Sequence, residues 1–388
     1  MSTSIILPRI MQIGEGASDD ISSVVLSLGC YHPLIVTDKV MVQLGYIATI
    51  QSNLRDNEVE SQVYDETIPE PTTASLLAGV DLVRHGHFDS IIAVGGGSSI
   101  DSAKAISILG IHGGQMRDYK VPRIVNKQGL PVIAIPTTAG TGSEATRFTV
   151  ITDEKTDEKM LCMGNGFMPT ATLLDFNLTL SAPPRVTADT GIDALTHAIE
   201  AYVSRKANQY SDVQALTAMR LLTANLRAVF HDGYNKPARK SMMLGAHLAG
   251  VAFSNASVAL VHGMSRPIGA AFHVPHGLSN AMLLPAVTRF SIPAATERYA
   301  DCARAMGIAE ASESDKIANE KLITELESLN EELKVPSLAE FGVERKKFFE
   351  LMPLMAEQAL ASGSPDNNPV IPTSEQIIAI YQSLWDAV

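Results

Sequence analysis

The first half of the chain alternates short apolar runs with segments of helical character. Three runs of aliphatic, largely β-branched residues predict buried strands: 33–38, 89–94 and 130–135. Helical patterns lie between them, over 72–85 and 98–109. Apolar strands that alternate with helices are typical of a parallel sheet covered on both faces. We therefore expect a Rossmann-like α/β domain over residues 1–183.

The second half is dominated by longer helical periodicities. After Pro183-Pro184, seven helices are predicted: 187–205, 210–231, 237–257, 292–306, 315–333, 345–361 and 374–385. Thr373 or Ser374 can cap the last of these, because a hydroxyl there accepts a hydrogen bond from the first turn. The Pro-, Asn- and Ser-rich segment 362–372 predicts a loop before it. The sequence thus predicts an all-α domain over 184–388.

The composition fits a globular protein and argues against some classes of partner. A hydrophobic fraction of 46% supports a large core, and a net charge of −12 argues against binding to nucleic acid or an anionic membrane. Cys30, Cys162 and Cys302 are too few and too scattered for a disulfide framework. The N-terminus does not have the pattern of a signal peptide, and no apolar stretch is long enough for a transmembrane helix. We expect a cytoplasmic protein.

Four residues of the second half form a candidate metal site. Asp193 and His197 are four residues apart in a predicted helix, so both project from the same face. His262 and His276 lie further along the chain and can complete the set. One carboxylate and three imidazoles suit a borderline cation such as Fe(II) or Zn(II) rather than Mg(II) or Ca(II). Convergence of these four residues would make the protein a metalloenzyme.

Two loops that follow predicted strands are candidates for phosphate binding. Gly95, Gly96 and Gly97 run from a strand into a helix that begins near Ser98, where backbone N–H groups and the helix dipole attract an anion. A tight turn without a ligand is the alternative. The second loop, 136–144, is rich in threonine and glycine and follows the next strand. Two such loops at strand ends indicate a dinucleotide in the crevice of an open α/β sheet.

Asp38 lies at the end of the first predicted strand. A carboxylate there can hold the adenosine ribose hydroxyls of a dinucleotide and repel a 2′-phosphate. It precedes the glycines by more than 50 residues, so the spacing of the usual dinucleotide fingerprint does not support this role. The other interpretation is a turn or cap residue.

These motifs together resemble the iron-containing, group III alcohol dehydrogenase family, in its order and spacing. They are Thr37-Asp38-Lys39, Gly95-Gly96-Gly97-Ser98 with Asp101, Thr137-Thr138-x-Gly140-Thr141-Gly142-Ser143-Glu144, Thr190-Gly191-x-Asp193-Ala194-Leu195-Thr196-His197-Ala198-x-Glu200, and His262-Gly263-Met264 with Pro275-His276-Gly277. The resemblance implies the fold shared with dehydroquinate synthase, with NAD(P) bound by the α/β domain and the metal by the helical domain. Relatives in this family are usually dimers or larger, so a homodimer or larger homo-oligomer is expected.

The resemblance also assigns residues to roles. It makes Asp193, His197, His262 and His276 the metal ligands. It implies these cofactor residues: Asp38, Gly95, Gly96, Gly97, Ser98, Asp101, Thr137, Thr138, Thr141, Ser143 and Lys159. Asp38 then favours NAD over NADP, and Lys159 matches a lysine beside the nicotinamide.

The chain departs from the family pattern at Arg266, where many relatives have a histidine that is often given a proton-transfer role. Arginine stays protonated at any working pH, so it cannot take that role. His273 can relay the proton instead, or Arg266 can bind an anionic group of the substrate. Alternatively, Arg266 points elsewhere, and the metal and water suffice. Glu70 is a second departure, since relatives often carry asparagine there.

The predicted activity is NAD- and metal-dependent interconversion of a small primary alcohol or diol and its aldehyde, with His273, Arg266 and Lys159 as candidate catalytic residues. Fe(II) is the expected metal, and Zn(II) is possible. Two alternatives stay open: a dehydroquinate synthase-like lyase with no net redox change, and a binding protein that has lost turnover. A non-haem iron oxygenase is less consistent, because it leaves the dinucleotide loops unexplained.

Overall fold

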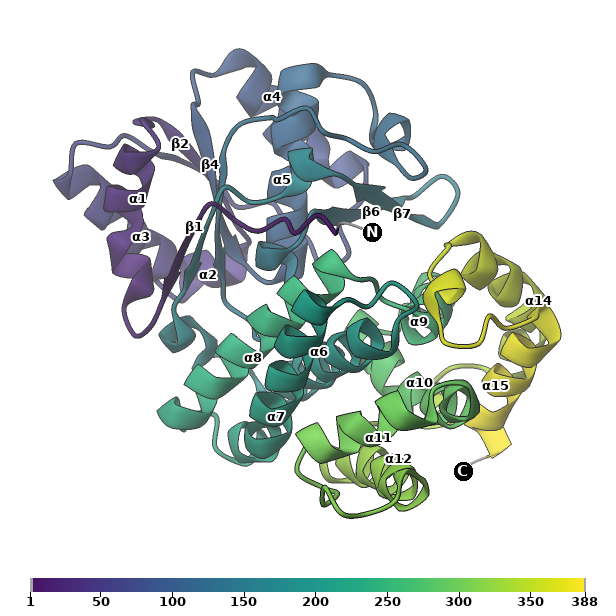
Figure 1. Cartoon of the computed structure of the whole chain (residues 1–388). Helices are drawn as coiled ribbons and strands as arrows, with labels where there is room; N and C mark the ends of the chain where they lie inside the picture. The colour runs from purple at the N-terminus through teal and green to yellow at the C-terminus, as the bar shows by residue number, and fades with distance from the viewer. Residues whose placement is uncertain (1–2, 387–388) are drawn as a thin grey trace. The chain divides into compact units, whose positions relative to one another are not determined.

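The computed structural model describes residues 3–386, which form two compact units (Figure 1). The α/β unit comprises Ile6–Ala182. The helical unit begins at Pro183 and also includes residues 3–5. The expectation of a parallel-sheet domain followed by a helical domain is confirmed.

A six-stranded parallel sheet forms the centre of the α/β unit, in the order β1-β8-β5-β4-β2-β3. Its strands are β1 (Ile10–Ile13), β2 (Pro33–Val36), β3 (Gln62–Tyr64), β4 (Ser90–Gly95), β5 (Val132–Pro136) and β8 (Ala171–Leu174). The three strands predicted from the sequence are β2, β4 and β5, which lie side by side in the sheet. The strand that follows β2 along the chain, β3, lies toward one edge of the sheet, and the strand that follows β4, β5, lies toward the other. The strand order therefore reverses between β2 and β4. Ligands of open α/β sheets bind at such a reversal, outside the carboxyl ends of the strands.

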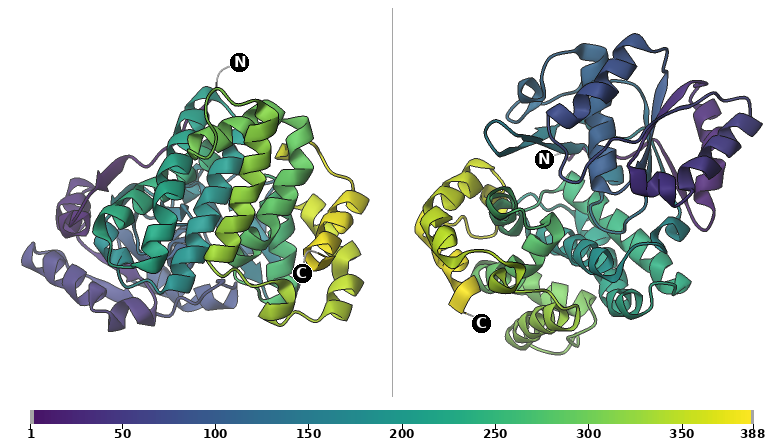
Figure 2. Two further views of the ribbon diagram at one scale, coloured as in Figure 1. Left: turned by 90° about the horizontal axis from the view of Figure 1, so that it is seen from below. Right: turned by 180° about the vertical axis from the view of Figure 1, so that it is seen from behind.

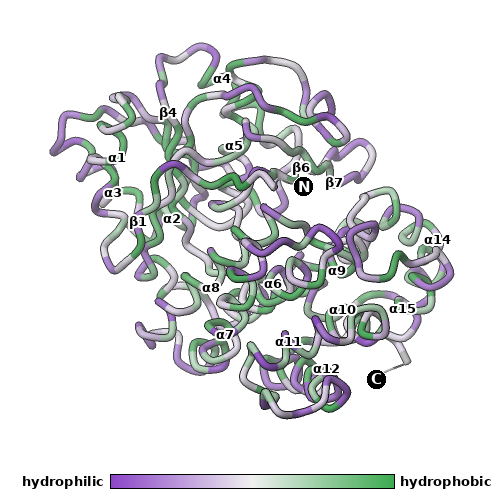
Figure 3. The backbone as a smooth tube through the Cα atoms, in the orientation of Figure 1, coloured by the Kyte–Doolittle hydropathy of each residue, from purple (hydrophilic) through white to green (hydrophobic). Residues whose placement is uncertain are grey.

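Helices cover both faces of this sheet because its central strands are apolar on both sides. Ile35 and Ile92 pack toward α1 (Ile21–Ser27) and α3 (Tyr46–Asp56). On the other face, Leu34 and Ile91 pack toward α4 (Leu77–His85) and α5 (Gly97–His112). Figure 3 shows the hydrophobic colour concentrated along β4 and the neighbouring strands.

Several elements of the α/β unit were not predicted. They are the outer strands β1, β3 and β8, the helices α1, α2 (Lys39–Gln43) and α3, and the antiparallel hairpin of β6 (Phe148–Asp153) and β7 (Glu158–Met163). The outer strands have three or four residues each, too few to show a clear hydrophobic period.

The helical unit contains ten α-helices within its described residues, and Figure 2 shows several of them running alongside one another. They are α6 (Pro184–Val203), α7 (Gln209–His231), α8 (Lys236–Asn255), α9 (Leu260–Phe272), α10 (His276–Ser291), α11 (Thr296–Ala305), α12 (Asp315–Glu332), α13 (Leu338–Phe341), α14 (Arg345–Ala361) and α15 (Ser374–Asp386). The seven predicted helices are confirmed to within four residues at each end. Three helices were not predicted: the four-residue α13, and α9 and α10, which contain the internal prolines Pro267 and Pro285.

Within residues 3–386, no single helix is long and apolar enough to cross a membrane. The pair α8 and α9 reaches the required length and composition only when joined, across a bend of 103°.

A buried lysine fastens the chain after the threonine-rich loop to α5. The ammonium of Lys104 donates to the carbonyl oxygens of Thr146, at 3.0 Å, and Phe148, at 2.7 Å, and to the Thr146 hydroxyl. Its side chain is completely buried, and burial lowers its pKa to about 8 although Asp101, 3.9 Å away, opposes this shift. Lys104 therefore holds the start of β6 against α5.

We expect Lys104→Met to lower the free energy of unfolding by about 2–3 kcal/mol, because buried acceptors that lose their donor cost about 1–3 kcal/mol each. The deficit should widen as the pH rises from about 8 to about 10.4, since unfolded lysine still binds a proton in this window and folded Lys104 has released it. Chemical denaturation over this pH range measures both effects, with exposed Lys127→Met as the control. A deficit that narrows with rising pH would contradict the account.

Candidate active site

Three helices bring the predicted metal ligands together. α6 carries Asp193 and His197 one turn apart, His262 lies in the first turn of α9, and His276 is the first residue of α10. Asp193, His197 and His262 are buried, and the His276 side chain is one-third exposed. Asp193 therefore lies close to all three histidines within the helical unit, and their role as metal ligands stays a prediction.

The donor atoms are spaced to share one cation. Asp193 Oδ1 lies 3.6 Å from His262 Nε2 and 3.8 Å from the Nε2 atoms of His276 and His197. The donor atoms of Asp193, His262 and His276 all lie within 4.8 Å of one another. Tetrahedral bonds of about 2.0–2.2 Å place ligand atoms about 3.3–3.6 Å apart. The separations of 3.6–3.8 Å from Asp193 Oδ1 to the three histidines are close to this range.

Close helix packing positions His276 near α6. An added Cβ on Gly277, which follows His276, would lie 2.4 Å from the carbonyl oxygen of Asp189 in α6. Only a residue without a side chain allows this approach. The His197 ring is held by stacking, because Phe253 of α8 lies on one side at 4.2 Å between centroids and His262 contacts it at 4.5 Å. Packing thus fixes the donors before any ligand binds.

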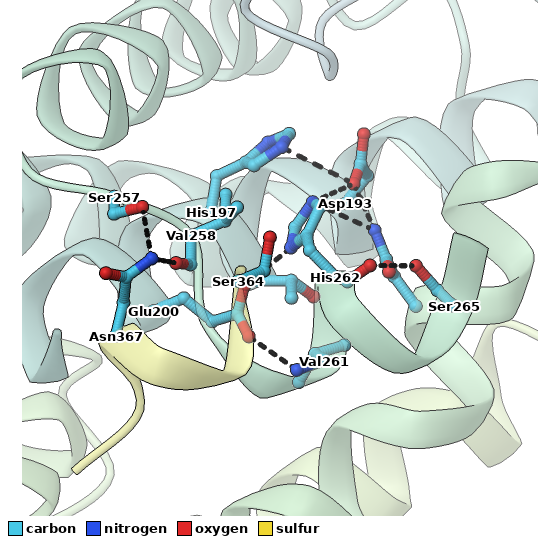
Figure 4. Close-up of polar contacts among 12 residues, drawn as sticks. Asp193, His197, Glu200, Ser257, Val258, Val261, His262, Ser265, Ser364 and Asn367 are labelled. Carbon is cyan, nitrogen blue, oxygen red and sulfur yellow. Dashed lines mark hydrogen bonds and ion pairs between the residues drawn. The ribbon is translucent and has the colours of Figure 1, made fainter. Parts of the chain in front are cut away.

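Glu200 orients His262, as Figure 4 shows. It lies on α6, one turn beyond His197, and its carboxylate accepts from His262 Nδ1 at 2.5 Å and from the backbone N–H of Val261 at 2.6 Å. A carboxylate at Nδ1 keeps the proton on that nitrogen, which leaves Nε2 free to bind a metal. This role of Glu200 was not predicted, although its position three residues after His197 places it on the same helix face.

Electrostatics favour a cation at this site. Burial by itself would raise the pKa of Asp193, but His197, His276 and His262 outweigh it, and the pKa lies well below its usual value. Burial lowers the pKa of His262, yet Glu200 and Asp193 raise it to about 8. An ionised carboxylate among imidazoles is the donor chemistry of a divalent transition metal.

Arg266 and His273, two candidate catalytic residues, both lie on or after α9. Arg266 Nη1 donates to the Ser364 hydroxyl at 3.1 Å, and burial lowers the pKa of its guanidinium while the charge of Glu200 opposes this. His273 ends α9 in a left-handed conformation and is exposed. Arg266 thus has a partner within the protein. Its role as an anion receptor and proton relay by His273 both stay predictions.

The cofactor residues of the α/β unit gather where β2, β4 and β5 end. An added Cβ on Gly97 would lie 2.8–3.0 Å from the side-chain atoms of Thr141, so the glycine- and threonine-rich loops touch. Thr137 continues β5, and its N–H donates to the carbonyl of Gly95. Thr138 lies beside the same loop, because a Cβ on Gly96 would be 3.5 Å from its hydroxyl. The glycine-rich and threonine-rich loops therefore lie against each other at the carboxyl ends of these strands.

Asp38 has a structural role and also faces the glycine loop. Its Oδ1 accepts from the backbone N–H groups of Val40 and Met41, at 2.8 and 3.1 Å, and so caps α2. Its Oδ2 accepts from the Ser99 hydroxyl at 3.4 Å. Both interpretations made from the sequence are therefore compatible, because capping uses only one of the two oxygens.

Asp101 and Ser143 bind each other rather than facing outward together. The Ser143 hydroxyl donates to Asp101 Oδ1, and the N–H of Val150 donates to Oδ2 at 2.8 Å. Burial raises the pKa of Asp101, while the charge of Lys104 lowers it. Both carboxylate oxygens thus have protein partners, which indicates that Asp101 shapes the loop.

Lys159 and Glu70, a predicted cofactor residue and a departure from the family pattern, form an ion pair. Lys159 lies on β7 with only 9% of its side chain exposed. The N–H of Glu70 donates to the Ser98 hydroxyl at 3.3 Å. Glu70 therefore connects the lysine with the glycine loop, a link that the sequence did not predict.

Comparison with known proteins places the chain in a family. Residues 8–176 match the family model of iron-containing alcohol dehydrogenases, and residues 187–385 match the C-terminal model of the Fe-containing alcohol dehydrogenase family. Alcohol dehydrogenase 4 of Saccharomyces cerevisiae (strain ATCC 204508 / S288c) is 36% identical over 99% of both chains. The NAD-dependent methanol dehydrogenase of Bacillus methanolicus is 34% identical over 98% of this chain and 99% of that one.

The fold comparison agrees. A crystal structure of 1,3-propanediol oxidoreductase superposes with a TM-score of 0.94 at 34% identity, over 99% of this chain and 100% of that one. The chain belongs to the iron-containing alcohol dehydrogenase family. The resemblance inferred from the motifs is confirmed, and so is the expectation of an alcohol dehydrogenase.

Glu200→Gln should weaken divalent metal binding about 10- to 100-fold, the usual effect of losing the partner of a ligating histidine. Glutamine can accept only one of the two hydrogen bonds that Glu200 accepts, so either His262 or the Val261 N–H loses its partner. Competition with a chelator measures the affinity for Co(II) or Zn(II), and exposed Glu320→Gln is the matched control. Equal affinities of wild type and Glu200→Gln would show that Glu200 does not orient a ligand.

Proposed function

We propose that the protein is an NAD-dependent dehydrogenase that interconverts a small primary alcohol or diol and its aldehyde, with Fe(II) held by Asp193, His197, His262 and His276. The observation that carries the proposal is the spacing of these donors, 3.6–3.8 Å from Asp193 Oδ1 to each histidine. Zn(II) would compete for the same site, because divalent affinity rises from iron to zinc.

The helical unit would prepare the metal site without rearrangement. Asp193 supplies the single negative charge among the donors, and the histidines supply neutral nitrogen lone pairs. Glu200 keeps the His262 proton on Nδ1, away from the donor atom. A divalent metal held there would act as a Lewis acid that lowers the pKa of an alcohol hydroxyl and polarises an aldehyde carbonyl.

The α/β unit would bind the dinucleotide, whose nicotinamide accepts the hydride. α5 begins at Gly97, the third glycine, and its N-terminus offers backbone N–H groups and a partial positive charge to the pyrophosphate. Asp38 faces this loop with the oxygen that does not cap α2, which suits a ribose hydroxyl and disfavours a 2′-phosphate. The name of the Bacillus methanolicus relative supports NAD, and those of two similar proteins support small alcohols and diols.

No observation favours the alternatives of a lyase or an inactive binding protein. Both family models describe alcohol dehydrogenases, and the donor atoms of Asp193, His262 and His276 lie within 4.8 Å of one another. The homodimer and the cytoplasmic location stay predictions.

The activity test uses anaerobically purified protein reconstituted with Fe(II), assayed by NADH absorbance with short primary alcohols and diols. Wild type should reduce NAD, and His276→Ala should lose at least about 100-fold in kcat, because it removes a donor of the ion that activates the hydroxyl. His231→Ala, an exposed histidine at the end of α7, is the control. Full activity of His276→Ala would contradict the assignment, and a lyase would produce no net NADH.

Gly97→Ala should weaken NAD binding about tenfold, equivalent to about 1.4 kcal/mol. The new methyl group meets Thr141 at 2.8–3.0 Å and forces the two loops apart. Thr141→Ser removes one of the contacted atoms, so the double variant Gly97→Ala/Thr141→Ser should recover part of the affinity. Titration calorimetry of NAD binding to wild type, the two single variants and the double variant gives the coupling free energy between the two positions. Purely additive losses would show that the contact between the loops is not the cause.

A further inference from the structure

Asn280 is a buried amide in direct contact with the proposed metal donors. It lies on α10, one turn after His276, and is 0% exposed. Its Nδ2 donates to Asp193 Oδ1 at 2.7 Å and lies 3.2 Å from His262 Nε2 and 3.3 Å from His276 Nε2. The amide therefore faces the very atoms that would bind the ion.

The orientation of the amide follows from its neighbours. The ionised carboxylate oxygen of Asp193 is an acceptor, so the nitrogen of the amide faces it. Its Oδ1 is buried without a hydrogen-bond partner among the described residues. A buried acceptor without a partner lowers stability. The amide thus bonds to Asp193 through Nδ2 while its Oδ1 has no hydrogen bond.

The three distances also say where the amide lies. They differ by only 0.6 Å (3.3 against 2.7 Å), so Nδ2 lies over the triangle of Asp193 Oδ1, His262 Nε2 and His276 Nε2 rather than along one of its edges. A water molecule or a substrate oxygen cannot occupy the same position. His197 is not a corner of this triangle. Its ring instead stacks against the rings of Phe253 and His262.

We propose that Asn280 is a positioning residue that holds Asp193 through a hydrogen bond and closes the Asp193–His262–His276 side of the donor set to water. The inference rests on the proposed metal site. It limits the number of ligands around the ion, and it requires the substrate oxygen to approach from another side. A metal-bound carboxylate that also accepts a hydrogen bond keeps a fixed orientation, and losing such a partner weakens metal binding.

The test uses Co(II) as the probe, because its visible absorption reports the number of ligands. Wild type, Asn280→Ala and Asn280→Asp are titrated with Co(II) as full-length proteins. Asn280→Ala opens space for water, and we expect about 10- to 100-fold weaker Co(II) binding and a weaker visible band. Asn280→Asp keeps the volume but replaces the donor by an oxygen, and its band should also weaken as an extra ligand joins.

Asn319→Ala is the matched control. Asn319 is also buried, donates one hydrogen bond through Nδ2 to the carbonyl of Thr296 at 2.9 Å, and has an unpartnered Oδ1, but it lies on α12. Its loss should leave the Co(II) affinity and spectrum unchanged. Thermal melting of each apoprotein separates a folding defect from an altered site.

Each outcome decides the inference. Wild-type affinity and spectra in both Asn280 variants would overturn it while leaving the metal site in place, and would show that the amide only fills space. Failure of wild type to bind Co(II) would overturn the metal site itself, and this inference with it. A weaker band in both Asn280 variants, with Asn319→Ala unchanged, is the result expected.

Discussion

The negative charge of Asp193, 1% exposed in the middle of the helical unit, is the constraint on which the site depends. A buried carboxylate is costly unless it is paired and hydrogen-bonded. Three histidines and an amide from α6, α9 and α10 surround it, and Glu200 fixes the proton of one of these histidines. The arrangement combines one carboxylate with three imidazoles, so the unit carries a polar centre suited to a cation.

The proposed dinucleotide site of the α/β unit is built from different chemical groups. Its site is made mostly of backbone, and the side chains around it mainly hold that backbone in place. Asp101 and Lys104 fasten the segment after the threonine-rich loop to α5, and Gly97 lets the two loops touch. Charged side chains near this edge are largely paired, as Lys159 is with Glu70. A dinucleotide would be held by N–H groups and one carboxylate oxygen of Asp38.

The central strands and long helices could be predicted because their hydrophobic patterns are long and regular. Helical spacing alone showed that Asp193 and His197, the proposed ligands of α6, share one face of the helix. α9 and α10, which carry His262 and His276, were not predicted. Each contains an internal proline, but so does α14, which was predicted, so proline alone does not account for the difference. Glu200 and Asn280 have no motif that marks them as functional. Their roles depend on contacts between helices, such as 2.5 Å from Glu200 to His262, which no local pattern encodes.

Anomalous X-ray diffraction at the iron edge, on crystals grown anaerobically with Fe(II), tests the central claim most directly. The account predicts one strong peak within bonding distance of Asp193 Oδ1 and the Nε2 atoms of His197, His262 and His276. A fully iron-loaded protein with its peak elsewhere, or with fewer than three of these residues as ligands, would contradict it.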